Sequence, residues 1–109
     1  MYEDTDKRRI YWLIDQYLNG KIIAWDFTTF YFSCYNVEMD SDFLTPTEDK
    51  LFSELSAIAG RFTDIQEDLI KYPGTYFSEK ELKPKVIEVK AILQENGDWQ
   101  KAMATIDRS

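Results

Sequence analysis

Two short segments, TPTE at 45–48 and SEKE at 78–81, have the pattern of a helix start and so restrict what this chain can fold into. In each, a hydroxyl residue precedes a glutamate by three positions, and the two side chains can satisfy backbone N–H groups of a helix N-terminus reciprocally. Pro46 suits the first position of a helix, where no backbone N–H is needed. The sequence therefore predicts that one helix begins at Pro46 and another just after Ser78.

Apolar residues recur at steps of three and four along four segments, which is typical of helices that bury one face. The expected helices cover 5–19, 22–36, 46–62 with a possible extension to Ile65, and 78–96. Asn19-Gly20 and Asn96-Gly97 are expected C-terminal stops. Pro84 predicts a kink or a late start in the last of these helices, because proline removes a helical hydrogen bond.

The segment from Thr63 to Thr75 is expected to be a connection that ends in a turn at Tyr72-Pro73-Gly74. Residues 98–109 can form one further short helix, capped by Asp98. No alternating pattern is long enough for a sheet, and 109 residues suit one domain. The sequence thus predicts an all-α fold, a single domain over 1–109, built as an antiparallel four-helix bundle with an optional short extra helix at the C-terminus.

The segment FTTFYFSCY at 27–35 concentrates aromatic rings on the second expected helix. At 100° per residue, its core face is expected to hold Ile23, Phe27, Phe30, Tyr31 and Cys34. Trp25 and Phe32 fall on nearly the opposite side, with Tyr35 between. Two interpretations stay open: the C-terminal segment with Trp99 covers this second side, or part of it is exposed as an aromatic anchor for a partner.

Charge and residue types exclude several classes of function. The chain has 13 Lys and Arg against 20 Asp and Glu, a net charge of -7, which repels nucleic acid and anionic membranes and favours a basic protein partner. The alternative is that this charge serves only solubility. With no histidine, one cysteine and no glycine-rich phosphate loop, the sequence predicts no enzyme, no cofactor and no metal site. A carboxylate enzyme that uses a divalent cation is a minor rival.

The beginning of the chain lacks an apolar run of signal-peptide length, and no segment is apolar enough for a membrane span. The sequence therefore predicts a cytoplasmic protein that does not bind membranes.

Acidic residues gather near the expected helix ends and are the candidate contacts for a basic partner. The alternative is that they are solvated loop residues and helix N-termini, which favour negative charge. Glu54 could link the acidic runs along the third helix. The candidate partner-binding residues are Glu38, Asp40, Asp42, Glu48, Asp49, Glu54, Asp64, Glu67, Asp68 and Tyr72.

The order of helices and several motifs resemble the colicin D type of bacterial immunity protein, which includes immunity proteins of contact-dependent growth inhibition systems. The motifs are LNGKIIAWDFTTFY at 18–31, Leu51-Phe52, Arg61-Phe62 before an acidic run, and YFSEKELKPKV at 76–86. The resemblance implies a four-helix bundle that binds and blocks a cognate toxin, often a tRNA-cleaving nuclease.

By position, the resemblance assigns Asp64, Glu67 and Asp68 to contacts with the basic active site of the toxin, in place of RNA phosphates. Gly60 differs from the acidic residue that the family pattern would place before Arg61-Phe62. The protein is expected to be a monomer or a weak dimer when free. The rival hypothesis is a small acidic adaptor or secretion chaperone that holds an amphipathic client segment on the aromatic helix.

Overall fold

The computed structural model of the protein describes residues 7–38, 44–63, 65–72 and 74–106. Within these ranges the fold is all-α, as predicted, with six α-helices and one π-helical segment. The elements are α1 (Arg8–Leu18), α2 (Ala24–Phe32), η1 (Ser33–Glu38), α3 (Pro46–Ala59), α4 (Gln66–Lys71), α5 (Glu79–Glu95) and α6 (Asp98–Ile106).

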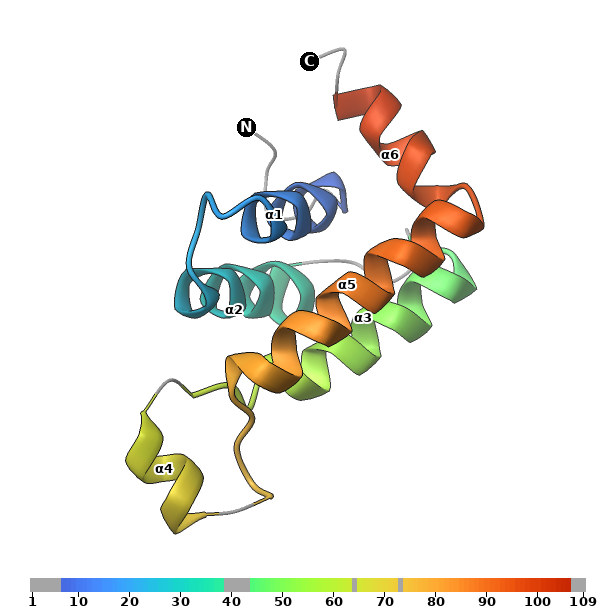
Figure 1. Cartoon of the computed structure of the whole chain (residues 1–109). Coiled ribbons are helices and arrows are strands. Elements are labelled where there is room, and N and C mark those ends of the chain that lie inside the picture. The colour runs from blue at the N-terminus through green and yellow to red at the C-terminus, as the bar shows by residue number, and fades with distance from the viewer. Residues whose placement is uncertain (1–6, 39–43, 64, 73, 107–109) are drawn as a thin grey trace.

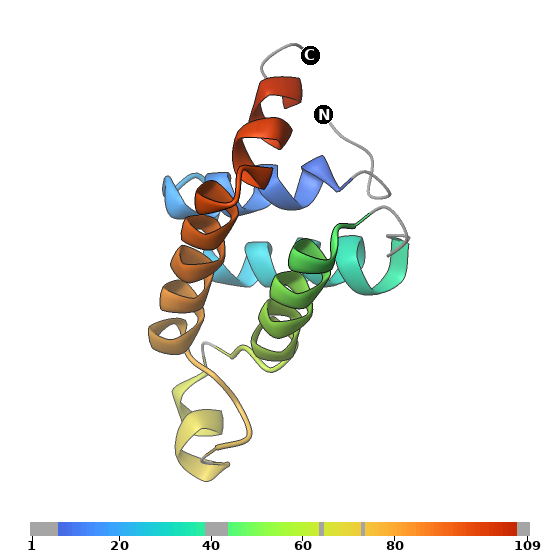
Figure 2. The same ribbon diagram turned by 90° about the vertical axis from the view of Figure 1, so that its right-hand side faces the viewer.

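The four helices α1, α2, α3 and α5 enclose the core as two pairs. Figures 1 and 2 show α1 beside α2 and α3 beside α5, with the two pairs crossing steeply. At one end of the molecule α6 folds back against α1 and α5. At the opposite end α4 projects away from the other helices (Figure 1), so that the protein is elongated, with extents of 45 × 27 × 26 Å.

The core is rich in aromatic rings, most of them from α1, α2 and α3. Phe27 stacks on Tyr17 of α1 with ring centroids 4.9 Å apart, and on Tyr31 at 5.7 Å. The buried Tyr31 hydroxyl donates a hydrogen bond of 2.6 Å to the carbonyl of Phe52, which ties α2 to α3. Burying one such side chain contributes roughly 1.5–3 kcal/mol, so these rings account for much of the stability.

Both predicted helix starts are confirmed. Thr45 Oγ1 accepts a 3.1 Å hydrogen bond from the backbone N–H of Glu48, whose Oε1 in turn accepts one of 2.8 Å from the N–H of Thr45. Ser78 and Glu81 form the second capping box. Pro84 predicted a kink or a late start, and the late start does not occur, since α5 begins directly at Glu79 and continues through the proline.

The second helix differs from its predicted form at both ends. Ile23 precedes α2 as its N-cap residue with an extended backbone, so the helical spacing does not apply to it and its side chain is exposed. Phe30 is 43% exposed, because it lies at the edge of the buried stripe that Phe27 and Tyr31 occupy. From Ser33 onward the helix widens into η1, and Cys34 is buried there as expected.

The third helix is shorter than predicted, and the segment after it contains a helix that the sequence pattern did not indicate. α3 ends at Ala59 with Gly60 as its C-cap, so Phe62 and Ile65 lie outside it. The six-residue helix α4 follows within the expected connection. Its short length gives it no apolar periodicity, which explains why the spacing analysis missed it.

Candidate partner-binding surface

Residues 62–77, which we call the arm, leave the helical core and return to nearly the same point. Phe62 and Phe77 form an isolated parallel β-bridge at the base. The backbone N–H of Thr63 donates a hydrogen bond of 2.9 Å to the carbonyl of Phe77. The N–H of Phe77 donates one of 2.8 Å to the carbonyl of Arg61. These two bonds close the base of the arm, and α4 lies within its projecting part (Figure 1).

The arm presents apolar side chains to solvent together with acidic ones. α4 contains no buried residue. The rings of Tyr72 and Tyr76 pack edge to face with centroids 6.0 Å apart, yet Tyr72 is 47% exposed. Ile65 and Ile70 are also exposed. Exposed apolar groups concentrated on a projecting element are typical of an interaction surface rather than of a folded core.

The acidic run that the sequence singled out lies on this arm. Glu67 is exposed and has no hydrogen bond or ion pair with the other described residues, whereas the half-buried Asp68 accepts a 3.4 Å hydrogen bond from Thr63 Oγ1. Asp64 lies outside the described residues. Two of the three predicted carboxylates are therefore displayed next to each other on α4.

Glu48 does not belong to the acidic surface, although the sequence analysis included it among the partner contacts. Its side chain is 2% exposed and lies between α1 and α3. The carboxylate accepts a 2.9 Å hydrogen bond from Lys7 Nζ and one of 2.5 Å from the Tyr11 hydroxyl, in addition to its capping bond with Thr45. It stabilises the junction of the two helix starts instead of facing a partner.

The surroundings of Glu48 keep it ionised. Burial alone would raise the pKa of its carboxyl, but the hydrogen bonds from Thr45 and Tyr11 and the Lys7 ammonium lower this pKa below its ordinary value. Burial and the same carboxylate raise the pKa of the Tyr11 hydroxyl, so Tyr11 remains the proton donor.

The other candidate acidic residues are not assembled into one patch. Glu54 forms an ion pair of 2.6 Å with Lys85, which lowers the pKa of its carboxyl and offsets its charge. Asp49 is exposed near the start of α3, about 15 Å along that helix from its end next to the arm. The side chain of Glu38 and the whole of Asp40 and Asp42 lie outside what the structure describes. A continuous acidic stripe through Glu54 is not supported, because Lys85 interrupts it.

The exposed side of α2 joins the arm through an aromatic patch, which we define as Trp25, Phe32 and Phe62. Trp25 and Phe32 are 50% and 49% exposed. Of the two interpretations left open by the sequence, coverage by the C-terminal segment does not hold, because Trp99 packs on Tyr11 instead, with ring centroids 5.5 Å apart. Trp25 contacts Phe62, at the base of the arm, at 6.5 Å. The aromatic patch and the arm thus form one continuous surface.

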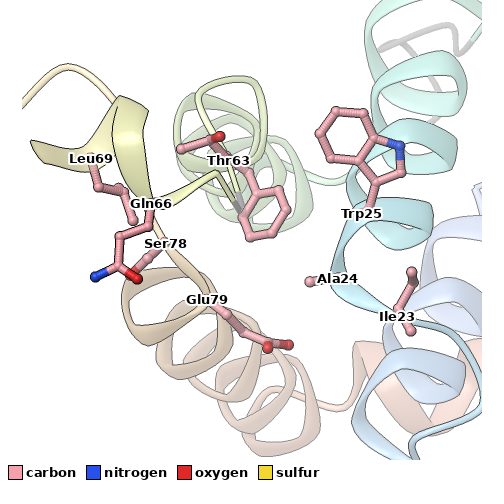
Figure 3. A pocket seen from close by; sticks show the side chains of 9 residues that line it. Ile23, Ala24, Trp25, Thr63, Gln66, Leu69, Ser78 and Glu79 are labelled. Carbon is pink, nitrogen blue, oxygen red and sulfur yellow. The ribbon is translucent and has the colours of Figure 1, made fainter. Parts of the chain in front are cut away.

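Two hollows flank the contact between Trp25 and Phe62. One, of about 280 Å³, extends over Thr29 and Phe32 toward Gly60. The other, of about 270 Å³, lies between α2 and the arm. Figure 3 shows Trp25 and Ile23 on the α2 side of this second hollow, Gln66 and Leu69 on the arm side, and Glu79 reaching between them from α5.

Sequence reasoning missed Phe62 and Glu79 as parts of this surface. The third expected helix extended to Phe62, and only the earlier end of α3 at Ala59 places Phe62 outside that helix. Glu79 looked like an acidic residue of a helix first turn. The sequence shows that Phe62 and Trp25 are aromatic, but no sequence pattern predicts that these two residues lie side by side.

No protein-family model matches this sequence, and neither a curated protein nor a solved structure is found to match it. The resemblance to colicin D immunity proteins therefore depends on the short motifs alone. In the part of the chain that the structure describes, no helix is long and apolar enough to cross a bilayer. The same described residues contain no group of three histidine, cysteine or acidic side chains that could hold a metal ion.

Proposed function

We propose that this protein is an immunity protein that binds a basic bacterial toxin domain, a tRNA-cleaving nuclease by the family resemblance, and covers its active site. The observation that carries the proposal is the projecting arm with Glu67 and Asp68 beside the solvent-exposed Trp25. Such a surface combines a charge that attracts a basic cleft with rings that stabilise a complex once water is displaced.

Inhibition of this kind needs no catalytic group. A nuclease holds RNA phosphates with lysine and arginine, so its cleft is electropositive. The carboxylates of the arm occupy that cleft in place of phosphates and exclude the substrate. The net charge of -7 would accelerate association with such a cleft, to roughly 10⁸–10⁹ M⁻¹s⁻¹ at low salt.

In this proposal the core is the four-helix bundle of the resembled family, made of α1, α2, α3 and α5, with the arm and α6 added at opposite ends. The protein acts in the cytoplasm, where an incoming tRNase meets its substrate, and is a monomer or weak dimer when free. It requires no cofactor and contacts no nucleic acid directly.

Co-expression tests the proposal. The toxin domain for this test is to be sought as the basic C-terminal domain of a large secreted protein in the reading frame next to this one. We expect cells that express this domain alone to stop growing and to lose intact tRNA, and cells that also express the 109-residue chain to grow normally. Continued growth arrest and tRNA cleavage, with both proteins present in soluble form, would contradict the proposal.

The aromatic patch favours one other function, that of an adaptor or secretion chaperone. A client helix or extended segment could place its apolar side chains on Trp25 and Phe32. Such chaperones are commonly dimers, so light scattering separates the two functions: a monomer that forms a one-to-one complex with a folded toxin domain supports an immunity protein, and a stable dimer that binds only an unfolded segment supports a chaperone.

A further inference from the structure

The hollow between α2 and the arm combines aromatic walls with a single carboxylate. Trp25 and Phe62 meet at one side, Leu69 adds apolar surface from the arm, and the solvent-exposed Glu79 also lines the hollow. Of the described residues that line it, Glu79 alone is charged. The hollow is therefore a small, largely apolar site with one negative group.

One contact with the core holds the Glu79 side chain in place where it lines this hollow. Glu79 is the first residue of α5, and its Oε2 accepts a 2.5 Å hydrogen bond from the buried Tyr17 of α1. Its second oxygen, Oε1, has no hydrogen bond or ion pair with any described residue. Figure 3 shows the side chain extending from α5 toward Ala24. One carboxylate oxygen is thus fixed by the core while the other remains available to a ligand.

We propose that this hollow binds one arginine side chain of the partner protein. This inference rests on the proposed function in that the partner is taken to be a basic toxin domain. The guanidinium packs against the faces of Trp25 and Phe62 and donates a hydrogen bond to Glu79 Oε1, while its methylene groups contact Leu69. Arginine suits such a site better than lysine, because its planar, weakly hydrated cation both stacks on rings and pairs with a carboxylate.

Size and charge favour this occupant over others. Pockets for drug-sized ligands measure about 300–1,000 Å³, so a hollow of about 270 Å³ suits a single long side chain. An apolar side chain would displace water from Glu79 Oε1 without giving it a hydrogen bond, which is costly. An anion would be repelled by the same carboxylate and by Glu67 and Asp68 nearby on the arm. A cation with an apolar stem pairs with the Glu79 carboxylate and also packs against the apolar walls.

Titration with N-acetyl-arginine amide tests the site without the toxin. The chain has three tryptophans, so its indole N–H groups give three resolvable NMR signals, and a Trp25→Phe variant assigns that of Trp25. We expect a saturable shift of the Trp25 signal with a dissociation constant in the millimolar range, while the signals of Trp12 and Trp99 stay in place. N-acetyl-citrulline amide, which has the same shape but no charge, is expected to bind about fivefold more weakly.

Two charge-neutralising variants on the same helix complete the test. Glu79→Gln keeps an oxygen that can accept from Tyr17 and is expected to weaken binding of the arginine amide about fivefold. Glu95→Gln makes the same change at the exposed far end of α5 and is expected to leave binding unchanged. Equal binding of the citrulline amide, or unchanged binding to Glu79→Gln with an unaltered melting temperature, would overturn the inference.

The outcome of this titration is independent of the proposed function. Selective binding of the arginine amide together with failure to neutralise any toxin would leave the arginine site in place and remove the immunity function. If the protein neutralised a toxin but its Trp25 signal did not respond to the arginine amide, the immunity function would stand and the arginine site would be ruled out.

Discussion

Replacing Glu48 by alanine is expected to lower the free energy of unfolding by about 3 kcal/mol. The substitution leaves the Lys7 ammonium, the Tyr11 hydroxyl and the Thr45 N–H without their common acceptor, and the Tyr11 hydroxyl is in the interior. A buried donor without a partner costs about 1–3 kcal/mol, so the loss exceeds that of an ordinary helix cap. Urea denaturation followed by far-ultraviolet circular dichroism measures this difference.

The neighbouring Asp49 provides the matched control for Glu48. It is also acidic and lies in the first turn of α3, but it is exposed, and the hydrogen bond that its side chain accepts from Tyr35 is long at 3.5 Å. Asp49→Ala is therefore expected to change the free energy of unfolding by no more than about 0.5 kcal/mol. If the two variants were equally stable, the buried network around Glu48 would not stabilise the fold as described.

The stability of Glu48→Ala should also respond less to acid than that of the unaltered protein. The pKa of Glu48 in the folded protein lies below its ordinary value of 4.5. Its contribution is therefore complete above pH 4.5 and is lost as the pH falls through the lower, folded-state pKa. The variant lacks this contribution, so its free energy of unfolding decreases less steeply over the same acidic range.

Reversing the two described charges on α4, with Glu67→Lys and Asp68→Lys together, is expected to weaken toxin binding at least about 100-fold, or about 2.7 kcal/mol. Two lysines placed against a cationic cleft repel it, whereas Glu67 and Asp68 attract it. Both side chains contribute little to the fold. Among the described residues Glu67 forms no side-chain hydrogen bond or ion pair, and the Asp68 carboxylate accepts one hydrogen bond of 3.4 Å. Surface plasmon resonance with the toxin domain measures the change.

A variant with the same change in net charge separates a local from a global effect. Glu88→Lys with Glu95→Lys alters two exposed residues further along α5. We expect this control to retain toxin affinity within about threefold, because charges beyond a Debye length of about 10 Å are screened at ordinary salt. If both double variants bound equally, the arm would have no special part in recognition.

The sequence predicted the helix starts better than any other feature of the fold, because a capping box is a local interaction between residues three apart. The same pattern also indicates the capping role that Glu48 has in the structure. A capping glutamate turns back to the backbone of its own helix start, so it is less available to a partner than Asp49 beside it. The pattern could not show that Lys7 and Tyr11, from the beginning of α1, contact the Glu48 carboxylate and bury it.

The candidate surface depends on contacts between distant segments, which spacing along one helix does not reveal. The helical pattern placed Trp25 and Phe32 on the side of α2 opposite its core face, and the structure leaves both half exposed. Whether the C-terminal segment covers these two rings depends on where Trp99 packs, and only the tertiary fold shows that. The contact of Trp25 with Phe62 likewise required α3 to end at Ala59, before the base of the arm.

Hydrogen exchange of the protein with and without the proposed toxin domain tests the central claim most directly. The account predicts that the amides of the arm and of α2 around Trp25 become protected in the complex, while those at the start of α3 and in α6, at the other end of the molecule, exchange as before. Protection confined to the region around Asp49 and α6, with the arm unchanged, would contradict it.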